Sequence, residues 1–385
     1  MNKNRSVVSL GILLCGLALV YFWSIGAAAA ARPGPADPNP VAGILNSPRT
    51  GYVRPEWRIG APVTSGNLTV FPVTSSAWSG AHDFITLDEG LKSGKVLITE
   101  FGSTGPRGGR SIDNARVNTL SLTNRTGRTL VLLAGEMLIG GKQDRIVDQD
   151  QLIPPVERPI ALGVFCVEHG RWHGTTTSFG QNQSPSGPQV PGARKLFAAG
   201  AGGGTPGQQM ATPAVREKAE ARKDQNEVWS KVAETTKSLN ATSGTGALTR
   251  AYDDGHLAKK CQVYENQIRY RIQGKNVVGV VVAVSGRVVA ADIFASPSLF
   301  QRYWPKLLKS YALEALSAGK TPAGQINQLA AESFLYRSEG KASSENKKGI
   351  YRVTEHKLGD DASFELEYTA SAQPVLVHFN RIVSR

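Results

Sequence analysis

Residues 277–293 read VVGVVVAVSGRVVAADI and carry the strongest structural signal in the sequence. Two almost wholly apolar runs, 277–284 and 287–293, flank Ser285 and Gly286, and a two-residue connection containing glycine is typical of a tight β-hairpin. Side chains of a strand point alternately to its two sides, so runs that are apolar at nearly every position must be buried on both faces of a sheet. The stretch therefore predicts a buried pair of antiparallel strands.

Helical patterns stand on both sides of this hairpin. Apolar residues recur at helical spacing from Val215 to Leu239 and again over 257–268, which predicts two helices before it. A further helix is expected from Ser296, and Pro305 should kink it or restart it. The expected helix starts that pair a cap with a first-turn proline are Thr212-Pro213, Ser296-Pro297 and Thr321-Pro322. Strands are then expected at 350–356, 364–369 and 375–382.

The front part of the chain shows mainly strand patterns. Short apolar-rich runs separated by turn residues are typical of antiparallel β-structure. A helix at 87–92 interrupts them, and residues 124–127 (Asn-Arg-Thr-Gly) predict a hairpin turn because Asn and Gly tolerate positive φ. The expected strands are 68–74, 95–101, 116–123, 128–134, 145–153 and 159–168.

Together these patterns predict an α+β protein. Residues 59–173 are its β-rich half, expected as an antiparallel sandwich or open barrel, and residues 213–385 are a mixed half of helices and strands. Residues 174–212 are rich in Gly, Ser, Thr, Gln and Pro, which predicts a flexible insertion. The proline-rich residues 32–58 are expected to be a linker.

Composition narrows the function classes. With 385 residues, 41% of them hydrophobic and 19% charged, the chain can bury a core and is neither a disordered polyelectrolyte nor a helical fibre. Three cysteines exclude a disulfide-dense miniprotein and a cysteine-rich zinc array. The formal net charge of +13 favours anionic partners. The basic residues are dispersed, without a zinc-finger or aromatic RNA-binding pattern, so specific nucleic-acid binding is not expected.

The first residues predict export. Lys3 and Arg5 precede residues 7–26, which carry no charge, and five alanines follow at 27–31. The apolar run is longer than a usual signal core and nearly long enough to span a bilayer, so cleavage of residues 1–31 and retention as a membrane anchor both stay open. In either case the main domain is expected outside, in the periplasm or extracellular space or anchored to the membrane.

One polar segment with candidate chemistry is LAGEMLIGGKQDR, residues 133–145. Its glycine spacing is one residue too long for a phosphate-binding P-loop, and Gln143 stands where a magnesium-binding hydroxyl is needed. A Gly-Gly turn flanked by Lys142 and Arg145 remains, and its amides and cations can hold an anion. An ordinary turn with solvated charges explains the same residues.

A second polar segment, CVEHGRWH, follows at residues 166–173, where an expected strand ends. Alternation places Cys166 and Glu168 on one face and His169 on the other, which disfavours a zinc site of Cys166, His169 and His173 and a Cys–His nucleophile pair. No metal or cofactor is therefore expected. The candidate ligand-binding residues here are Arg171, Trp172 and His173.

A hypothesis of enzymatic function uses residues from both segments. Glu136 or Glu168 would be a general acid or base, His169 or His173 its proton partner, and Lys142 or Arg171 an anion clamp. This hypothesis requires that two segments 30 residues apart in the sequence lie side by side, as adjacent antiparallel strands allow. Buried ion pairs explain the same residues structurally.

Cys166 and Cys261 are the cysteines outside the export segment. An oxidising compartment allows a disulfide between them, whereas their apolar neighbourhoods equally predict two buried thiols. The sequence leaves this choice open.

Three stretches give the chain a family resemblance. Residues 133–145, residues 166–172 (CVEHGRW) and residues 292–308 (DIFASPSLFQRYWPKLL) resemble the ARG and rhodanese-phosphatase-superfamily-associated protein domain family over about residues 60–320. The resemblance implies a shared fold and makes the two polar segments candidates for a common site, without supplying a substrate. The export signal and the insertion at 174–212 depart from the family pattern.

The sequence thus predicts an envelope protein that binds an anionic ligand or a protein partner without catalysis. The alternative is a hydrolase that uses Glu136, Glu168 and His169, so whether the protein is an enzyme stays open.

Overall fold

The apolar hairpin lies inside the largest sheet. The computed structural model describes residues 56–77, 83–101, 117–171, 178–179, 209–319, 326–337, 341–347, 349–359 and 361–383. β13 (Val277–Val284) pairs with β14 (Arg287–Phe294), and Ser285 and Gly286 both have positive φ, 51° and 78°, as a two-residue hairpin turn requires. The predicted hairpin is confirmed.

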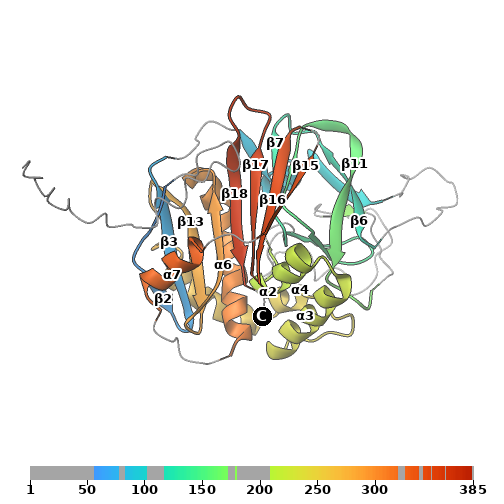
Figure 1. Cartoon of the computed structure of the whole chain (residues 1–385). Helices are drawn as coiled ribbons and strands as arrows, with labels where there is room; N and C mark the ends of the chain where they lie inside the picture. Colours follow the sequence, from blue (N-terminus) through green and yellow to red (C-terminus); the bar gives the residue numbers. More distant parts are fainter. Residues whose placement is uncertain are drawn as a thin grey trace, which may run out of the picture. The chain divides into compact units, whose positions relative to one another are not determined.

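Strands from both ends of the chain complete this sheet, whose order is β1-β3-β13-β14-β18-β17-β16-β15, with β2 paired to β3 (Figure 1). The β-rich and mixed parts of the sequence therefore share a sheet. β1 begins within the range expected to be a linker. The further strands are β1 (Trp57–Ile59), β2 (Val63–Ser65), β3 (Leu68–Ser75), β15 (Lys341–Lys347), β16 (Tyr351–Leu358), β17 (Asp361–Tyr368) and β18 (Val375–Ile382).

Helices cover both faces of the hairpin. On one face, Val280 and Val282 pack in a core with side chains of α6 (Pro297–Ser317). On the other face, Val281 packs in a core with side chains of α7 (Gln328–Leu335). Every residue of β13 is buried, which confirms the two-sided burial expected from the sequence.

The front part of the chain supplies two more sheets. One has the order β10-β7-β4 and the other β12-β5-β6-β11-β9-β8. With α1 (Leu87–Lys92) at the predicted position, the α+β class and the strand-rich N-terminal half are confirmed. The strands are β4 (Phe84–Thr86), β5 (Val96–Glu100), β6 (Thr119–Asn124), β7 (Thr129–Leu132), β8 (Met137–Leu138), β9 (Arg145–Val147), β10 (Gln151–Ile153), β11 (Val156–Cys166) and β12 (Ser178–Phe179).

The turn at 124–127 does not form the predicted hairpin. β6 and β7 belong to different sheets, so the turn carries the chain from one sheet to the other. The Asn124 side chain explains the change of direction: its amide donates to the carbonyl oxygens of Arg128 and Ile153, and its oxygen accepts from the Thr126 amide at 3.1 Å.

The long helix expected after Thr212 is broken. α2 (Pro213–Glu217) continues into one π-helical turn, η3 (Lys218–Arg222), and α3 (Gln225–Ser238) follows. Lys223 is left-handed at φ 58°, and the Asp224 carboxylate accepts from two amides of the first turn of α3. A left-handed residue followed by a new N-cap ends one helix and starts the next.

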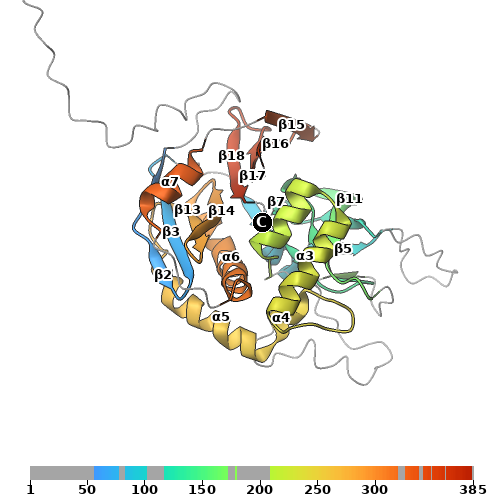
Figure 2. The same ribbon diagram turned by 60° about the horizontal axis from the view of Figure 1, so that its bottom comes forward.

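Three other expectations need correction or fall outside the structure. α6 runs through Pro305 without a restart. The helix start expected at Thr321-Pro322 lies outside the described residues, and α7 begins after its cap Asn327. The 174–212 segment is described only at β12 and from Gln209 onward. The remaining helices are α4 (Thr249–Asp253) and α5 (Gly255–Ile268), and Figure 2 shows both beside α6.

No helix in the described ranges combines the length and apolar character needed to cross a bilayer. Residues 7–26, the expected anchor or signal, lie outside these ranges.

Candidate functional site

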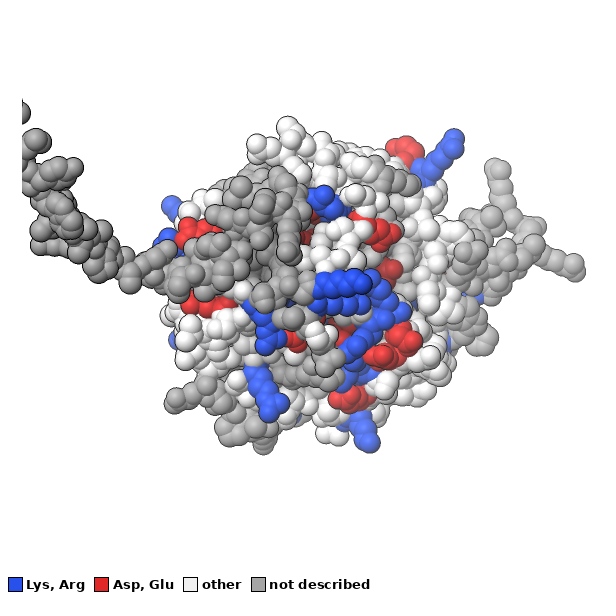
Figure 3. Space-filling view, in the orientation of Figure 1, with Lys and Arg blue, Asp and Glu red and all other residues white. Residues whose placement is uncertain are grey.

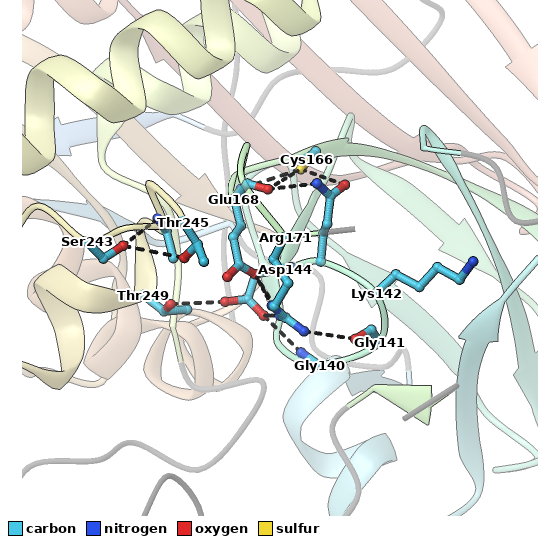
Figure 4. Close-up of polar contacts among 12 residues, drawn as sticks. Gly140, Gly141, Lys142, Asp144, Cys166, Glu168, Arg171, Ser243, Thr245 and Thr249 are labelled. Atoms are coloured by element: carbon cyan, nitrogen blue, oxygen red, sulfur yellow. Dashed lines mark hydrogen bonds and ion pairs between the residues drawn. The ribbon is translucent and has the colours of Figure 1, made fainter. Parts of the chain in front are cut away.

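Sheet pairing brings the two polar segments of the sequence together. β9 pairs with β8 on one side and with the end of β11 on the other, so the Gly140–Gly141 turn lies beside residues 166–171 (Figure 4). The backbones of the two polar segments are therefore adjacent, as the enzyme hypothesis required. The side chains decide what it can do.

Arg171 is held from three directions. Its Nε donates to Glu168 Oε2 at 2.8 Å, its Nη2 to Asp144 Oδ1 at 3.1 Å and its Nη1 to the Gly141 carbonyl at 3.0 Å (Figure 4). Thr249 donates to the second Asp144 oxygen at 3.0 Å, and the Asp144 amide donates to Glu168 at 3.1 Å. We call Asp144, Glu168, Arg171 and Thr249 the Arg171 cluster. Arg171 is therefore engaged by groups of the protein itself and is not a free cation presented to a ligand.

The burial and the neighbouring charges of the Arg171 cluster change the pKa of Asp144. Burial, and after it the neighbouring Glu168 carboxylate, raises the pKa of Asp144 to about 6, against the opposing effects of the Gly140 amide and Arg171. Asp144 therefore binds a proton more readily than an exposed aspartate does, and Arg171 pairs with both Asp144 and Glu168.

Glu136 belongs to a different place. Its side chain is fully buried, accepts from the Leu133 amide at 2.7 Å and pairs with Lys306, which also pairs with Asp88 at 2.9 Å. Burial is the main cause that raises its pKa to about 7. Within the described chain, no hydrogen bond or ion pair joins Glu136 to the Arg171 cluster.

The other predicted site residues are dispersed. His169 is exposed, and the edge of its ring contacts Trp229 with 4.4 Å between centroids. The Lys142 side chain points away from Glu168 and Arg171 in Figure 4. Arg145 is buried and its Nε donates to the Val117 carbonyl. Trp172 and His173 lie outside the described residues.

Cys166 and Cys261 are free, buried thiols in the structure. Burial raises the pKa of both, that of Cys261 to about 12. The disulfide that the sequence left open is not formed, and neither thiol is accessible as a nucleophile must be.

A pocket that sequence reasoning missed lies between η3 and the strands β15, β16 and β17. Its volume is about 240 Å³. Lys223, Ser343, Ser344 and Gln149 supply hydrogen-bond donors, Val353 and Phe364 supply apolar surface, and Glu220, Glu345 and Glu355 supply carboxyl groups. Both the π turn and the left-handed Lys223 occur at this wall, and such irregularities are frequent at functional sites.

Glu355 binds two lysines at the pocket wall. Lys223 reaches one carboxylate oxygen at 3.0 Å and Lys357 the other at 3.0 Å, and both lysines are more than half exposed. If Lys223 turned to a ligand, Lys357 would still neutralise Glu355. Figure 3 shows Lys and Arg side chains gathered in the middle of the face seen in Figure 1, with acidic side chains beside them.

A buried polar network lies behind the pocket. The Asn380 amide donates to both Glu220 oxygens, at 3.1 and 3.3 Å, and the neighbouring His378 lies between Asp150 (2.5 Å) and Asp292 (3.3 Å). Although burial alone would lower it, the two aspartates raise the pKa of His378 to about 9. Burial, reinforced by Asp150, raises the pKa of Glu220 well above its ordinary value, against the opposing effects of Arg216 and His378.

The sequence contains a weak signal for this second site. His378 and Asn380 interrupt the strand Val375–Ile382, and Asp292 interrupts the apolar run of β14. Polar residues inside fully buried strands need partners, which is the mark of an internal network. Neither the π turn nor the packing of β15 to β17 beside it has a recognisable local pattern.

Fold and site define an α+β protein with a small polar pocket beside a buried ion network. Residues 56–383 match the ARG and Rhodanese-Phosphatase-superfamily-associated Protein domain, and the chain belongs to this family. The predicted resemblance is thereby confirmed. No curated protein and no solved structure matches the chain.

Proposed function

We propose that this protein is an exported or membrane-anchored envelope protein that binds a small anionic ligand, without chemical turnover, in the pocket between η3 and β15–β17. The observation that carries the proposal is the pairing of one pocket carboxylate, Glu355, with two exposed lysines. Lys223 can leave the Glu355 carboxylate and bind the carboxylate of a ligand at little electrostatic cost, because Lys357 remains paired with Glu355.

The chemistry of the walls narrows the ligand. Ser343 lies opposite Glu355 in the β15–β16 register, and its hydroxyl and that of Ser344 add hydrogen-bond donors. Glu345 adds a negative charge, which favours a singly charged group over a phosphate dianion. Val353 and Phe364 offer an apolar surface. A monocarboxylate with a short apolar tail fits these groups, and 240 Å³ is the volume of about eight waters.

The Gly-Gly turn is a poorer anion site than the sequence suggested. Arg171 already binds two carboxylates and a carbonyl oxygen, and Lys142 points away from it. The hydrolase alternative needs Glu136, Glu168 and His169 around one substrate, whereas Glu136 pairs with Lys306 and Glu168 with Arg171. Binding without catalysis is therefore the function that the geometry favours.

Calorimetric titration of the full chain in detergent tests the proposal, with hexanoate, hexanol and orthophosphate as probes. We expect hexanoate to bind best and Lys223→Gln to weaken it about tenfold, the effect of losing one charge-assisted hydrogen bond. Lys142→Gln is the matched control, because it removes the cation of the other candidate site. Loss of binding in Lys142→Gln with none in Lys223→Gln would contradict the proposal.

A further inference from the structure

A second surface of the molecule carries cations without carboxylate partners. Lys259 and Lys260 on α5, and Arg271 and Lys275 after it, are exposed. Unlike the cations around the pocket, none of these four forms an ion pair in the described part of the chain. From His256 to Asn276 the sequence has one acid, Glu265, which is half-buried beside Lys309 and Arg269.

Apolar side chains stand among these cations. Val263 is 53% exposed and Tyr270 is 71% exposed, and the Arg269 guanidinium lies 6.0 Å from the Tyr270 ring centroid. Lys259, Val263 and Tyr270 follow one another at spacings of four and seven residues, which places them along one side of the helical path. The opposite side is buried through Leu257, Cys261 and Ile268.

The surroundings of α5 leave this side open. α5 packs against α6, α4 and β2, and Figure 2 shows it along the margin of the described fold. We call Lys259, Lys260, Val263, Tyr270, Arg271 and Lys275 the α5 face. It lies on different elements from the pocket and does not depend on it.

We propose that the α5 face docks on a lipid bilayer whose facing leaflet carries acidic headgroups. Charge complementarity selects this occupant, because each Lys or Arg near an anionic bilayer adds attraction and none of the four cations has an ion-pair partner among the described residues. Tyr270 is a side chain typical of the membrane interface, and Val263 adds apolar contact. Such a face would hold the pocket at a fixed orientation to the membrane from which the chain emerges.

A reporter at Val263 tests the docking. The full chain carries Val263→Cys in a Cys15→Ser background and is labelled with a polarity-sensitive dye, while Cys166 and Cys261 are protected by burial. We expect the emission to shift to shorter wavelength with phosphatidylglycerol vesicles, not with phosphatidylcholine vesicles, and to return in high salt. A label at Leu329→Cys, on α7 and 66% exposed, should not respond. Equal responses at both positions would overturn the proposal.

Charge variants give the second measurement. Lys259→Gln with Lys260→Gln should abolish at least half of the shift at residue 263. The matched control is Lys92→Gln with Lys95→Gln, two exposed lysines at the end of α1 and just before β5, and it should leave the shift unchanged. Equal losses in both pairs would show attraction through net charge alone and contradict a specific face. A response to double-stranded DNA but not to vesicles would replace the lipid surface by a polyanion and overturn it also.

Discussion

The Asp292 carboxylate, near the end of β14, accepts two hydrogen bonds from the guanidinium of Arg216 on α2, at 2.7 and 3.2 Å. Neither side chain has any exposure to solvent. Tyr311 of α6 donates to the same carboxylate, and His378 of β18 lies 3.3 Å from it. One acid in an apolar strand thus connects two helices and two strands.

Replacing one partner of this pair should be costly. Arg216→Met leaves a buried carboxylate with one cation fewer, and removal of one partner from a buried ion pair typically costs about 3–5 kcal/mol. We expect this loss in the free energy of unfolding from urea titration. Arg58→Met, which removes an exposed pair with Glu56, should cost less than about 1 kcal/mol. Similar losses in both variants would contradict the account.

Stability should fall at alkaline pH through His378. Its pKa is raised from 6.5 to about 9, so the folded state binds a proton that the unfolded state releases earlier. The contribution is complete below the unfolded pKa of about 6.5 and is lost as pH rises through about 9. The measurement is the urea midpoint between about pH 6.5 and pH 10. His378→Gln should be less stable than wild type below pH 7 and should flatten this part of the profile. A profile of His378→Gln as steep as that of wild type would assign the effect to other groups.

Gly141 should tolerate no side chain. A β-carbon there would lie 2.2 Å from Phe179 Cζ and 2.6 Å from Glu100 Oε1, and φ is +56°. Gly127 also has positive φ, +75°, but open space around it. Gly127→Ala should cost about 1 kcal/mol for the left-handed backbone alone, and Gly141→Ala at least about 2 kcal/mol more through overpacking. Melting temperatures measure the difference, and equal values would show that the turn can move away from Phe179.

Cys166 and Cys261 should resist thiol reagents in the native protein. Both are buried, and burial raises the pKa of each thiol, so little reactive thiolate is present near neutral pH. Titration of a Cys15→Ser variant should detect no reactive thiol before unfolding and two after it, with or without reductant. Two thiols that appear only after reduction would reveal a disulfide.

The sequence was most informative where burial alone sets the structure. The hairpin of β13 and β14 and the helix α1 were predictable, because apolar runs, turn residues and a capping box are local signals. The break at Lys223 was not, because the helical spacing of apolar residues continues across it. At residues 124–127 the local turn signal was right and the pairing wrong, since β6 pairs with β5 and β11 whereas β7 pairs with β4 and β10.

The candidate site, like the fold, was predictable from the sequence only in part. The sequence singled out Glu168 and Arg171 as candidate site residues, and Asp144 lies in the polar segment 133–145 without having been singled out. The pairing of β9 with β11 brings these residues together. Periodicity does not say whether a carboxylate meets a ligand or an arginine, and in the structure Glu168 meets Arg171. The pocket joins η3 to β15–β17 across more than a hundred residues, a distance over which local patterns carry no information.

The position of β18 has a consequence for how the chain acquires its structure. β14 lies between β13 and β18, and β18 begins 81 residues after the end of β14 (375 − 294). A polypeptide delivered from its N-terminus, by a ribosome or a translocation pore, therefore presents an unpaired apolar edge along β14 until β18 arrives. Completion of this sheet waits for a strand that is distant in sequence, and deletion of β18 should be felt at the buried hairpin.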